Sequence, residues 1–358
     1  MSLDTIQLRP GYAISRVIKG GWQLAGDHGP VERTDAVRDM EAFLDAGITT
    51  FDCADIYVGV EEMIGDFIGD IRARRGAAVA NRVRVHTKLV PDLGLLENIQ
   101  AKDVEAIIDR SLKRLQIEQL HLVQFFWWDV SLGNPQVGLE VLKRCQEKGK
   151  VAHLGVTNWD AAETQPFLDT GFDVVSTQVQ YSLLDRRPEN GLTNWALAND
   201  VQLLCYGTLA GGFLTERWLD QPDPGFEFEN RSLIKYRLII DEFGSWETFQ
   251  RLLRVLKSIG DKHSVSLSSV ATRWVLDKPR VAAAIVGARY ARHLPQTLEV
   301  FRFAIDGEDK AAIQAVLAAA PGPQGSVFAL ERDRNGRHGR IMKYNLNTKP
   351  DDKVLGSG

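Results

Sequence analysis

Cysteine is scarce in this chain of 358 residues, and the few cysteines stand apart. Cys53, Cys145 and Cys205 each lie within an apolar run, and none belongs to a Cys-x-x-Cys pair. Isolated cysteines in apolar surroundings are typical of reduced core residues rather than of a disulfide framework or a zinc site. We therefore expect no metal site.

A surplus of one charge and a long apolar run are also missing. The formal net charge is -4 and the pI is about 6.0, which excludes the basic surplus that attracts nucleic acid or anionic lipid. No segment approaches the roughly 18 uncharged apolar residues of a membrane span, and no apolar secretion signal opens the chain. These absences predict a cytoplasmic protein whose partner is a small molecule, with no nucleic-acid or membrane partner, and they leave the oligomeric state open.

The chain does contain a regular alternation of short β-rich runs and amphipathic helical patterns, from about residue 33 to residue 303. Helical spacing of apolar residues is clearest at 35–47, 104–116, 137–149 and 247–263. Gly47 and Gly149 stand where a helix end favours a residue with positive φ. The predicted strands are 14–20, 49–55, 83–89, 121–126, 151–157, 173–179, 201–207 and 282–288.

Eight strands alternating with helices predict a (β/α)8 TIM barrel of the α/β class. No linker rich in Pro, Gly and Ser divides the chain, so we expect a single domain over residues 1–320 and a C-terminal tail over 321–358. The link from 207 to 243 is longer than an ordinary βα loop, which suggests a lid or belt over the site, with a disordered insertion as the alternative. The tail is predicted either to arch over the barrel mouth or to fray.

The chemistry of such a barrel lies at the carboxyl ends of its strands. The second predicted strand contains Asp52 and is followed by Tyr57, and alternation along the third strand points Lys88 into the barrel. We expect the ammonium to lower the tyrosine pKa from about 10, so that the hydroxyl gives a proton to a carbonyl oxygen as a hydride arrives. The alternative is that Asp52 and Lys88 form only an interior ion pair.

Several motifs, taken in order, resemble those of the aldo-keto reductase family. FDCADIYVGVEEMIG (51–65) resembles the signature of the family, and HTKL (86–89) resembles the strand that carries its lysine. The later motifs are HLGVTNWD (153–160), VSTQVQYSLLDRR (175–187), LLCYGTLAGGFLT (203–215) and AAIVGARYARHLPQTLE (283–299). The resemblance implies an oxidoreductase that binds NADP(H) in an extended form, which agrees with the absence of a strand-linked Gly-x-Gly-x-x-Gly.

Carried over residue by residue, the resemblance implies that Tyr57 is the general acid and that Asp52 and Lys88 support it. It also implies polar contacts to the nicotinamide carboxamide and an aromatic ring stacked on the nicotinamide. The carboxamide ligands are Thr157, Asn158 and Gln178, and the stacking residue is Tyr206. Two alternatives stay open: Tyr206 as core filler, and Thr157 with Asn158 as a helix cap before Asp160.

The last motif implies a site for the adenosine end of the cofactor. Gly287, Arg289 and Arg292 lie at an expected helix N-terminus, where guanidinium groups and the helix dipole both favour a 2′-phosphate. Gln296 and Thr297 fall where the family contacts adenine. We therefore predict NADPH rather than NADH, with arginines on a solvated face as the alternative.

The motif HLVQFFWWD (121–129) departs from the family, because Phe126 takes the position of the usual histidine. A phenyl ring has no N–H donor for developing negative charge. We expect Phe126 and Trp127 to line the substrate pocket, with the indole N–H groups of Trp127 and Trp128 available to a substrate oxygen.

The predicted function is NADPH-dependent reduction of an aldehyde, ketone or sugar carbonyl, with Tyr57 as proton donor. The alternatives are an NADP(H)-binding sensor or regulator with little turnover, and a reductase of a different substrate type.

Overall fold

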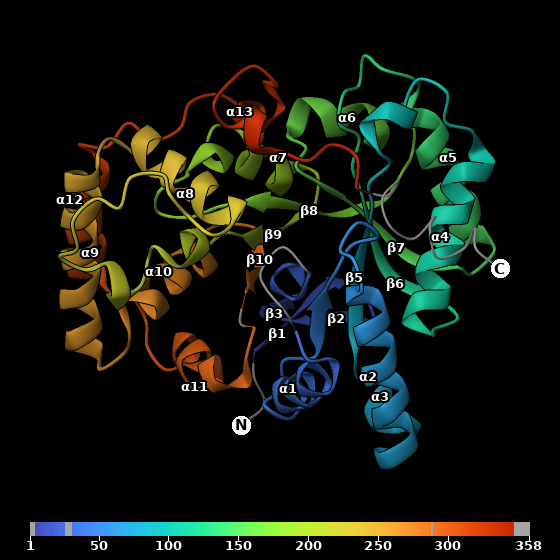
Figure 1. Cartoon of the computed structure of the whole chain (residues 1–358), viewed down its shortest axis with the longest axis horizontal. Helices are drawn as coiled ribbons and strands as arrows, with labels where there is room; N and C mark the ends of the chain where they lie inside the picture. The colour runs from blue at the N-terminus through green and yellow to red at the C-terminus, as the bar shows by residue number, and fades with distance from the viewer. Residues whose placement is uncertain (1–3, 26–30, 288, 347–358) are drawn as a thin grey trace. The chain divides into compact units, whose positions relative to one another are not determined.

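Eight strands form a closed parallel barrel in the computed structural model, which describes residues 4–25, 31–287 and 289–346 (Figure 1). Their order around the barrel is β10-β3-β4-β5-β6-β7-β8-β9. The strands are β3 (Val17–Gly20), β4 (Thr50–Asp52), β5 (Arg84–Leu89), β6 (Leu120–Phe125), β7 (Val151–Thr157), β8 (Val174–Gln180), β9 (Gln202–Tyr206) and β10 (Val281–Val286). The predicted (β/α)8 TIM barrel is confirmed.

The strands could be predicted from the sequence because both faces of the sheet are buried. Every residue of β8 and of β10 is buried, and parallel strands covered on both sides appear as near-continuous apolar runs. The register places Asp52 beside His86 across β4 and β5, and Lys88 beside Gln124 across β5 and β6. These pairings set the height of the candidate site residues in the barrel.

The run at residues 14–20 forms parts of two strands, so the single strand predicted there is wrong. β2 (Tyr12–Ser15) pairs antiparallel with β1 (Thr5–Arg9), and only the following β3 joins the barrel. Gly11 turns the chain between β1 and β2 with a φ of 80°, a conformation that costs glycine little. The Pro10-Gly11 pair is the sequence signal for this hairpin.

By its contacts, the chain divides into two compact units. The described parts of Lys19–Thr177 and Met342–Gly358 form one unit. Its helices are α1 (Arg33–Asp45), α2 (Val60–Arg75), α3 (Ala77–Ala80), α4 (Ala101–Leu115), α5 (Pro135–Glu147) and α6 (Ala161–Asp169). Gly47 and Gly149, just beyond α1 and α5, have φ of 93° and 76°, as expected for helix ends.

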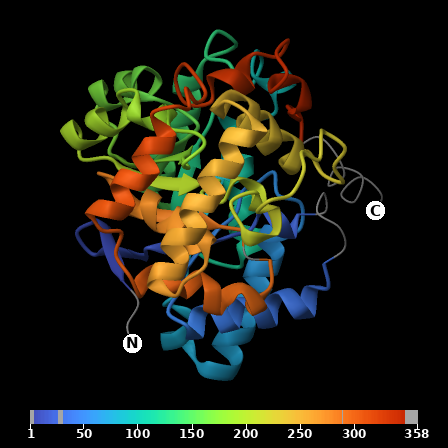
Figure 2. The same cartoon turned by 90° about the vertical axis from the view of Figure 1, so that its left-hand side faces the viewer.

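The other unit is formed by the described parts of Met1–Ile18 and Gln178–Ile341. Its helices are α7 (Leu192–Ala198), α8 (Arg231–Phe243), α9 (Trp246–His263), α10 (Leu267–Leu276), α11 (Leu294–Thr297), α12 (Gly307–Leu317) and α13 (Ala329–Arg332). Helix α9 packs against α10 and α12, and the gold and orange-red ribbons of these helices lie side by side in Figure 2. A single domain ending at residue 320 stays a prediction.

The link between residues 207 and 243 is folded rather than a disordered insertion. It contains short 3-10 helices at Ala210–Gly212 and Glu216–Trp218 and then α8. The Trp218 ring stacks on Phe213 with centroids 4.7 Å apart and meets Trp246 edge-on at 5.9 Å. The link is therefore packed on its own unit, and its predicted role as a lid over the site stays a prediction.

The tail does not fray over its described part. Glu331 of α13 is fully buried, and its carboxylate accepts hydrogen bonds from Arg187. Further on, the backbone carbonyl of Tyr344 accepts a hydrogen bond from Leu93 N at 2.9 Å. The tail is thus bound into each unit by its own set of contacts.

Two expectations from composition can be compared with the described residues. Cys53, Cys145 and Cys205 are free and buried, and their burial confirms the prediction that they are core residues. Among the described helices, none has the length and apolar character needed to cross a membrane.

Candidate active site

Asp52 and Lys88 form a buried ion pair at the carboxyl ends of β4 and β5. The Lys88 ammonium lies 2.9 and 2.8 Å from the two Asp52 carboxylate oxygens, and each side chain is 5% exposed. A third bond runs from Lys88 Nζ to the backbone carbonyl of Cys53 at 2.7 Å. The ammonium is therefore fully bonded and fixed in position.

Tyr57 lies against this pair. The Lys88 Nζ is 4.9 Å from the centroid of the Tyr57 ring, and the half-buried ring meets Trp22 at 4.9 Å. A turn that starts at Ala54 delivers the tyrosine, because Tyr57 N donates to Ala54 O at 3.0 Å. The structure thus brings together the three residues predicted to be catalytic.

The expected direction of the Tyr57 pKa shift is wrong. Burial raises the pKa of Tyr57 to about 12, although the Lys88 ammonium opposes the rise. Burial alone would lower the pKa of Lys88, but the negative charge of Asp52, with that of a tyrosinate at 57, outweighs burial and raises this pKa. At neutral pH the site therefore holds a protonated tyrosine beside a charged lysine, an arrangement suited to donating a proton.

Gln124 belongs to the same cluster, although it is not among the site residues predicted from the sequence. Its Nε2 donates to Asp52 Oδ1 at 3.3 Å, and its side chain is fully buried. The signal was present, because alternation along β6 points Gln124 inward beside Lys88. Asp52 therefore accepts from an amide as well as from the ammonium.

Phe126 directly follows β6, and its backbone N–H donates to Leu89 O at 3.0 Å. Its ring is 2% exposed and meets the ring of Trp128 edge-on with centroids 4.8 Å apart. The phenyl ring thus takes part in an aromatic cluster. It offers no hydrogen-bond donor at this position.

Trp127 contacts a different set of groups, which contradicts the expectation that its indole is available to substrate. The indole N–H donates to Leu132 O at 2.9 Å. The ring stacks on Phe125 at 5.9 Å and is fully buried. Neighbouring residues of an extended chain point to opposite sides, so Trp127 packs with Phe125 while Phe126 packs with Trp128.

The predicted carboxamide ligands lie at the carboxyl ends of β7 and within β8. Thr157 ends β7 and is buried, and Asn158 follows it in the left-handed region with φ of 56°. Asp160 caps α6 by accepting from the backbone N–H groups of Ala162 and Glu163. Thr157 and Asn158 are thus not the helix cap, which removes that alternative for them. Gln178 is buried in β8.

Tyr206 ends β9, half-buried beside a charged group rather than inside an apolar core. The Lys235 ammonium lies 5.3 Å from its ring centroid and 3.4 Å from the Glu331 carboxylate. Burial alone would raise the pKa of Glu331, but Lys235 and Arg187 outweigh burial and lower it to about 2. The tail therefore brings a permanent negative charge into the surroundings of Tyr206.

The predicted phosphate ligands gather on one aromatic ring. The guanidinium groups of Arg289 and Arg292 lie 5.2 and 4.3 Å from the centroid of the exposed Tyr290 ring. The expected helix is short and broken, because a 3-10 helix at Ala291–His293 precedes the four residues of α11. The helix dipole thus adds little here.

The remaining predicted residues of this site lie close by in the chain. Gly287 is exposed, and Ala288 of the same motif lies outside the described residues. Gln296 Nε2 donates to Ser268 Oγ at 3.0 Å, and the Thr297 hydroxyl donates to His293 O at 3.0 Å. Both side chains therefore make contacts within the protein at the positions predicted for adenine recognition.

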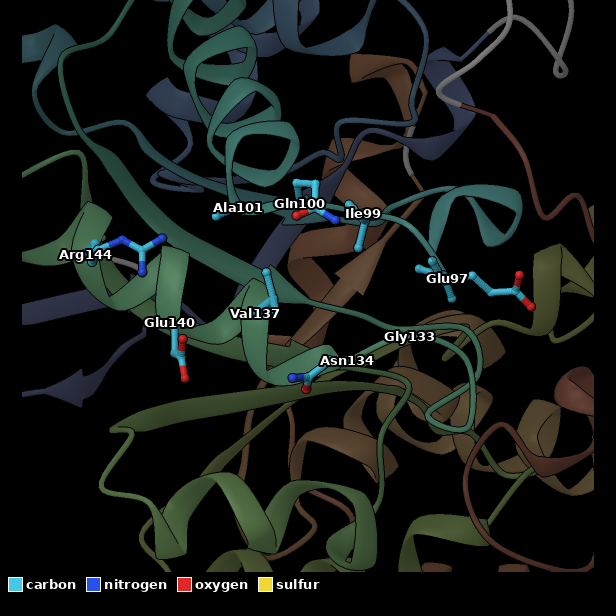
Figure 3. Close-up of a pocket in the computed structure, with 10 residues that line it drawn as sticks. Glu97, Ile99, Gln100, Ala101, Gly133, Asn134, Val137, Glu140 and Arg144 are labelled. Carbon is cyan, nitrogen blue, oxygen red and sulfur yellow. The ribbon is translucent and has the colours of Figure 1, made fainter.

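A surface hollow of about 430 Å³ lies in the unit that contains Lys88 (Figure 3). It is lined by residues of the loop before α4, the start of α4, the loop before α5 and α5 itself, namely Leu96, Glu97, Ile99, Gln100, Ala101, Gly133, Asn134, Val137, Glu140 and Arg144. None of the predicted site residues lines it. Its charged groups are of both signs, so it does not define a ligand class.

A parallel barrel with a buried lysine between an aspartate and a tyrosine defines a class of hydride-transfer proteins by analogy of fold and site. A family model described as "Aldo/keto reductase family" matches residues 16–318. The chain therefore belongs to the aldo/keto reductase family, a family of oxidoreductases.

Relatives and solved structures agree with this membership. The chain is 26% identical to aldo-keto reductase YhdN of Bacillus subtilis over 310 residues, which cover 86% of this chain and 91% of that protein. It is 24% identical over 306 residues to aryl-alcohol dehydrogenase GME11368 of Pestalotiopsis microspora, with 83% and 76% covered. The glycerol dehydrogenase AKR11B4 of Gluconobacter oxydans has a similar structure, with a TM-score of 0.76, 25% identity, and coverage of 91% of this chain and 98% of that one.

Proposed function

We propose that this protein reduces a carbonyl compound to an alcohol with NADPH, and that Tyr57 is the proton donor. The observation that carries the proposal is the Lys88 ammonium, bonded to Asp52 at 2.8 Å and placed 4.9 Å from the Tyr57 ring. An interior ion pair without a function would not require a half-buried tyrosine beside it. The substrate is an aldehyde, a ketone or a sugar carbonyl.

The proton step follows from the charges of the three side chains. As the carbonyl carbon receives hydride, negative charge develops on the oxygen, and the Tyr57 hydroxyl gives up its proton to that oxygen. The Lys88 ammonium stabilises the tyrosinate that forms, and Asp52 keeps Lys88 charged and oriented. Gln124 donates a further hydrogen bond of 3.3 Å to Asp52 Oδ1, which also accepts from Lys88.

Polar and aromatic residues at the strand ends are proposed as ligands of the dinucleotide. Thr157, Asn158 and Gln178 offer the hydroxyl and amide groups that match a carboxamide, and Tyr206 offers a ring face. When bound, NADPH supplies the hydride. An aldo/keto reductase of Klebsiella pneumoniae, whose structure is described as a complex with NADP and acetate, covers 90% of this chain and 98% of its own with a TM-score of 0.66 and 21% identity.

The choice of NADPH over NADH rests on Arg289 and Arg292. Two guanidinium groups beside one ring provide the bidentate donors that a 2′-phosphate dianion requires. NADH lacks this 2′-phosphate. Gln296 and Thr297 are proposed to lie near the adenine.

Phe126 favours a second candidate function, the binding of NADP(H) with little turnover. Loss of one donor to a developing oxyanion typically costs about 3 kcal/mol, or a factor of roughly 10² in rate. The buried phenyl ring has no such donor. A reductase of an unusual substrate type would show the same replacement.

NADPH oxidation with a panel of aldehydes, ketones, sugars and quinones, run beside NADPH titration by fluorescence quenching, tests the proposal. We expect turnover with at least one carbonyl class and micromolar or tighter NADPH affinity. Tight binding without turnover on any substrate would favour the second candidate. The absence of binding would overturn both.

A further inference from the structure

Lys235 of α8 has its ammonium group among aromatic rings, and one of these rings is that of Tyr206, the proposed stacking residue. The ammonium nitrogen lies 5.3 Å from the centroid of the Tyr206 ring and 5.7 Å from that of Tyr236. A third ring, that of Phe328 in the tail, has its centroid 5.6 Å from the same atom. Aromatic faces attract a cation through their quadrupole, so the three rings hold this charge in place.

A carboxylate of the tail keeps Lys235 charged. Glu331 Oε1 lies 3.4 Å from Lys235 Nζ, and the lysine side chain is 14% exposed. Burial lowers the pKa of Lys235, and the charge of Glu331 opposes this shift. Glu331 also accepts hydrogen bonds from Arg187, so its negative charge serves two cations. Lys235 thus presents a positive charge to the ring of Tyr206.

Close packing of α8 on the loop after β9 fixes the position of Lys235 relative to Tyr206. A Cβ atom added at Gly207 would lie 2.5 Å from the Tyr236 hydroxyl oxygen, and one added at Gly211 would lie 2.6 Å from the Tyr236 ring. Neither glycine therefore leaves room for a side chain. These residues all belong to one compact unit of the chain. The ammonium is preorganised beside the Tyr206 ring before any ligand binds.

Phe328 contributes its ring at an energetic cost. Its backbone has a φ of 61°, in the left-handed region that disfavours a bulky side chain. Phe328 is 5% exposed and directly precedes α13, the helix that contains Glu331. Backbone strain of this kind persists only where the surrounding structure imposes it, and it clusters at functional sites. One short segment of the tail thus delivers both a ring and a carboxylate to the Lys235 ammonium.

Tyr206 connects this charge with the proposed cofactor site. It ends β9 and is half-buried, and the proposed function gives it the nicotinamide ring as its stacking partner. That ring is neutral in NADPH and positively charged in NADP+. A cation at one face of an aromatic ring weakens the attraction of the other face for a second cation, and the two positive charges also repel each other.

We propose that Lys235 is a specificity-determining residue for the redox state of the cofactor, and that its ammonium makes the site bind NADPH in preference to NADP+. The inference rests on the proposed function, because it needs the nicotinamide to stack on Tyr206. Lys235 forms and breaks no covalent bond and keeps its proton. The site then favours the cofactor form that reduces a carbonyl, and it holds the oxidised form less tightly.

The test measures the dissociation constants of NADPH and NADP+ by isothermal titration calorimetry on the full chain. Lys235→Met removes the charge and keeps an unbranched side chain among the three rings. At an effective dielectric constant of about 20, two unit charges on opposite sides of a ring repel each other enough to change an affinity by roughly tenfold or more, and Glu331 offsets part of this. We therefore expect the ratio of the NADP+ constant to the NADPH constant to fall by roughly three- to tenfold in the variant.

Further variants separate the charge from the packing. Lys235→Gln, a second neutral variant, should reproduce the fall, whereas Lys235→Arg keeps the charge and should leave the ratio within a factor of about two. Lys278→Met is the matched control, because the Lys278 ammonium also lies over a ring, 3.8 Å from the Trp274 centroid, and pairs with Glu189 at 2.7 Å. Its loss should leave the ratio within a factor of about two.

A ligand without the nicotinamide distinguishes a specific effect from a loosened tail. 2′-Phospho-ADP-ribose should bind the wild type and the Lys235 variants with affinities that agree within a factor of about two. A lysine that only fixed the tail would instead weaken NADPH, NADP+ and 2′-phospho-ADP-ribose alike on removal. The ratio would then stay constant, and the inference would be overturned.

The outcomes also separate this inference from the proposed function, once carbonyl turnover is measured on the same proteins. A constant ratio in both neutral variants, with turnover of a carbonyl by the wild type, overturns the inference and leaves the reductase standing. A ratio that falls in both neutral variants, without turnover of any carbonyl by the wild type, upholds the role of Lys235 and overturns the reductase. A wild type that binds neither cofactor form overturns both.

Discussion

The Lys88 ammonium has two carboxylate oxygens and one carbonyl oxygen within 2.9 Å. With these partners it stays charged in a buried position, where desolvation would otherwise remove its proton. The Tyr57 ring lies at the edge of that charge, and burial raises its pKa to about 12. A tyrosine of such a pKa stays protonated over the neutral range, and it gives up its proton as negative charge develops on the substrate oxygen and makes that oxygen a stronger base.

Tyr57→Phe tests this role. The variant keeps the ring but removes the proton, so we expect the rate of NADPH-dependent carbonyl reduction to fall by roughly 10² to 10⁴. The NADPH affinity should stay within a factor of about two, because the hydroxyl is not among the proposed cofactor ligands. Steady-state kinetics and fluorescence titration measure the two quantities, and unchanged turnover would remove Tyr57 from the mechanism.

Phe126→His tests the missing donor at the same scale. An imidazole N–H at this position should raise kcat with generic aldehydes by roughly tenfold or more, since one donor to an oxyanion is worth about 3 kcal/mol when well placed. Phe126→Leu is the control, because it changes the ring without adding a donor. A rate that is unchanged or lower in the histidine variant would mean that the pocket is built for chemistry without that donor.

At the scale of elements, α13 joins the tail to the barrel through one buried carboxylate. Glu331 lies between Arg187 at 3.1 Å and Lys235 at 3.4 Å, and all three side chains are well buried. Removing the charge of Glu331 takes one counter-ion away from these two cations. Arg187 keeps its ion pair with Asp185. Such a loss is typically worth about 3–5 kcal/mol.

Glu331→Gln should therefore lower the free energy of unfolding by about 3 kcal/mol, measured by urea denaturation with circular dichroism. Glu308→Gln is the matched control, because the Glu308 side chain is 94% exposed. We expect the control to change the free energy by less than about 0.5 kcal/mol. Similar values for the two variants would show that the tail is not held by this carboxylate.

The segment after β10 carries the prediction on cofactor choice. Replacing both Arg289 and Arg292 by Ala should weaken NADPH binding by roughly 10- to 100-fold, since charge-assisted bonds to a phosphate are worth about 1.5–3 kcal/mol. NADH binding should change by less than about twofold. Arg340→Ala, at an exposed arginine of the tail, is the control. Equal losses for the two cofactors would rule out a 2′-phosphate role.

The elements themselves were largely predictable, because the strands and helices carry their signals locally. Seven barrel strands were placed to within a few residues, and the error at 14–20 came from missing the Pro10-Gly11 turn. Lys88 and Asp52 were found because alternation fixes which side chains face inward.

The partner of Glu331 was not predictable, since Arg187 lies 144 residues away and nothing local specifies the pairing. The Tyr57 pKa was missed because burial, which outweighs the ammonium, depends on the surrounding fold.

For the molecule as a whole, one buried lysine links stability to pH. Lys19 of β3 is 2% exposed, its ammonium lies 5.1 Å from the Phe43 ring centroid, and it has no hydrogen-bond partner among the described residues. Burial lowers its pKa to about 8 from 10.5, and Asp39 offsets only part of this. Because the unfolded chain holds this proton more tightly than the folded one, Lys19 destabilises the fold below pH 8, and the penalty disappears as the pH rises from about 8 towards 10.5.

Lys19→Met removes the charge while keeping an unbranched side chain. It should raise the free energy of unfolding at pH 7 by up to about 3 kcal/mol, the value of the difference between the two pKa values, and the gain should shrink between pH 8 and pH 10.5. Lys113→Met, at an exposed lysine of α4, controls for the loss of a positive charge and should be nearly neutral at every pH. Urea denaturation of the three proteins at pH 7, 8.5 and 10 gives the comparison, and a gain that does not depend on pH would place the effect in packing rather than in the proton.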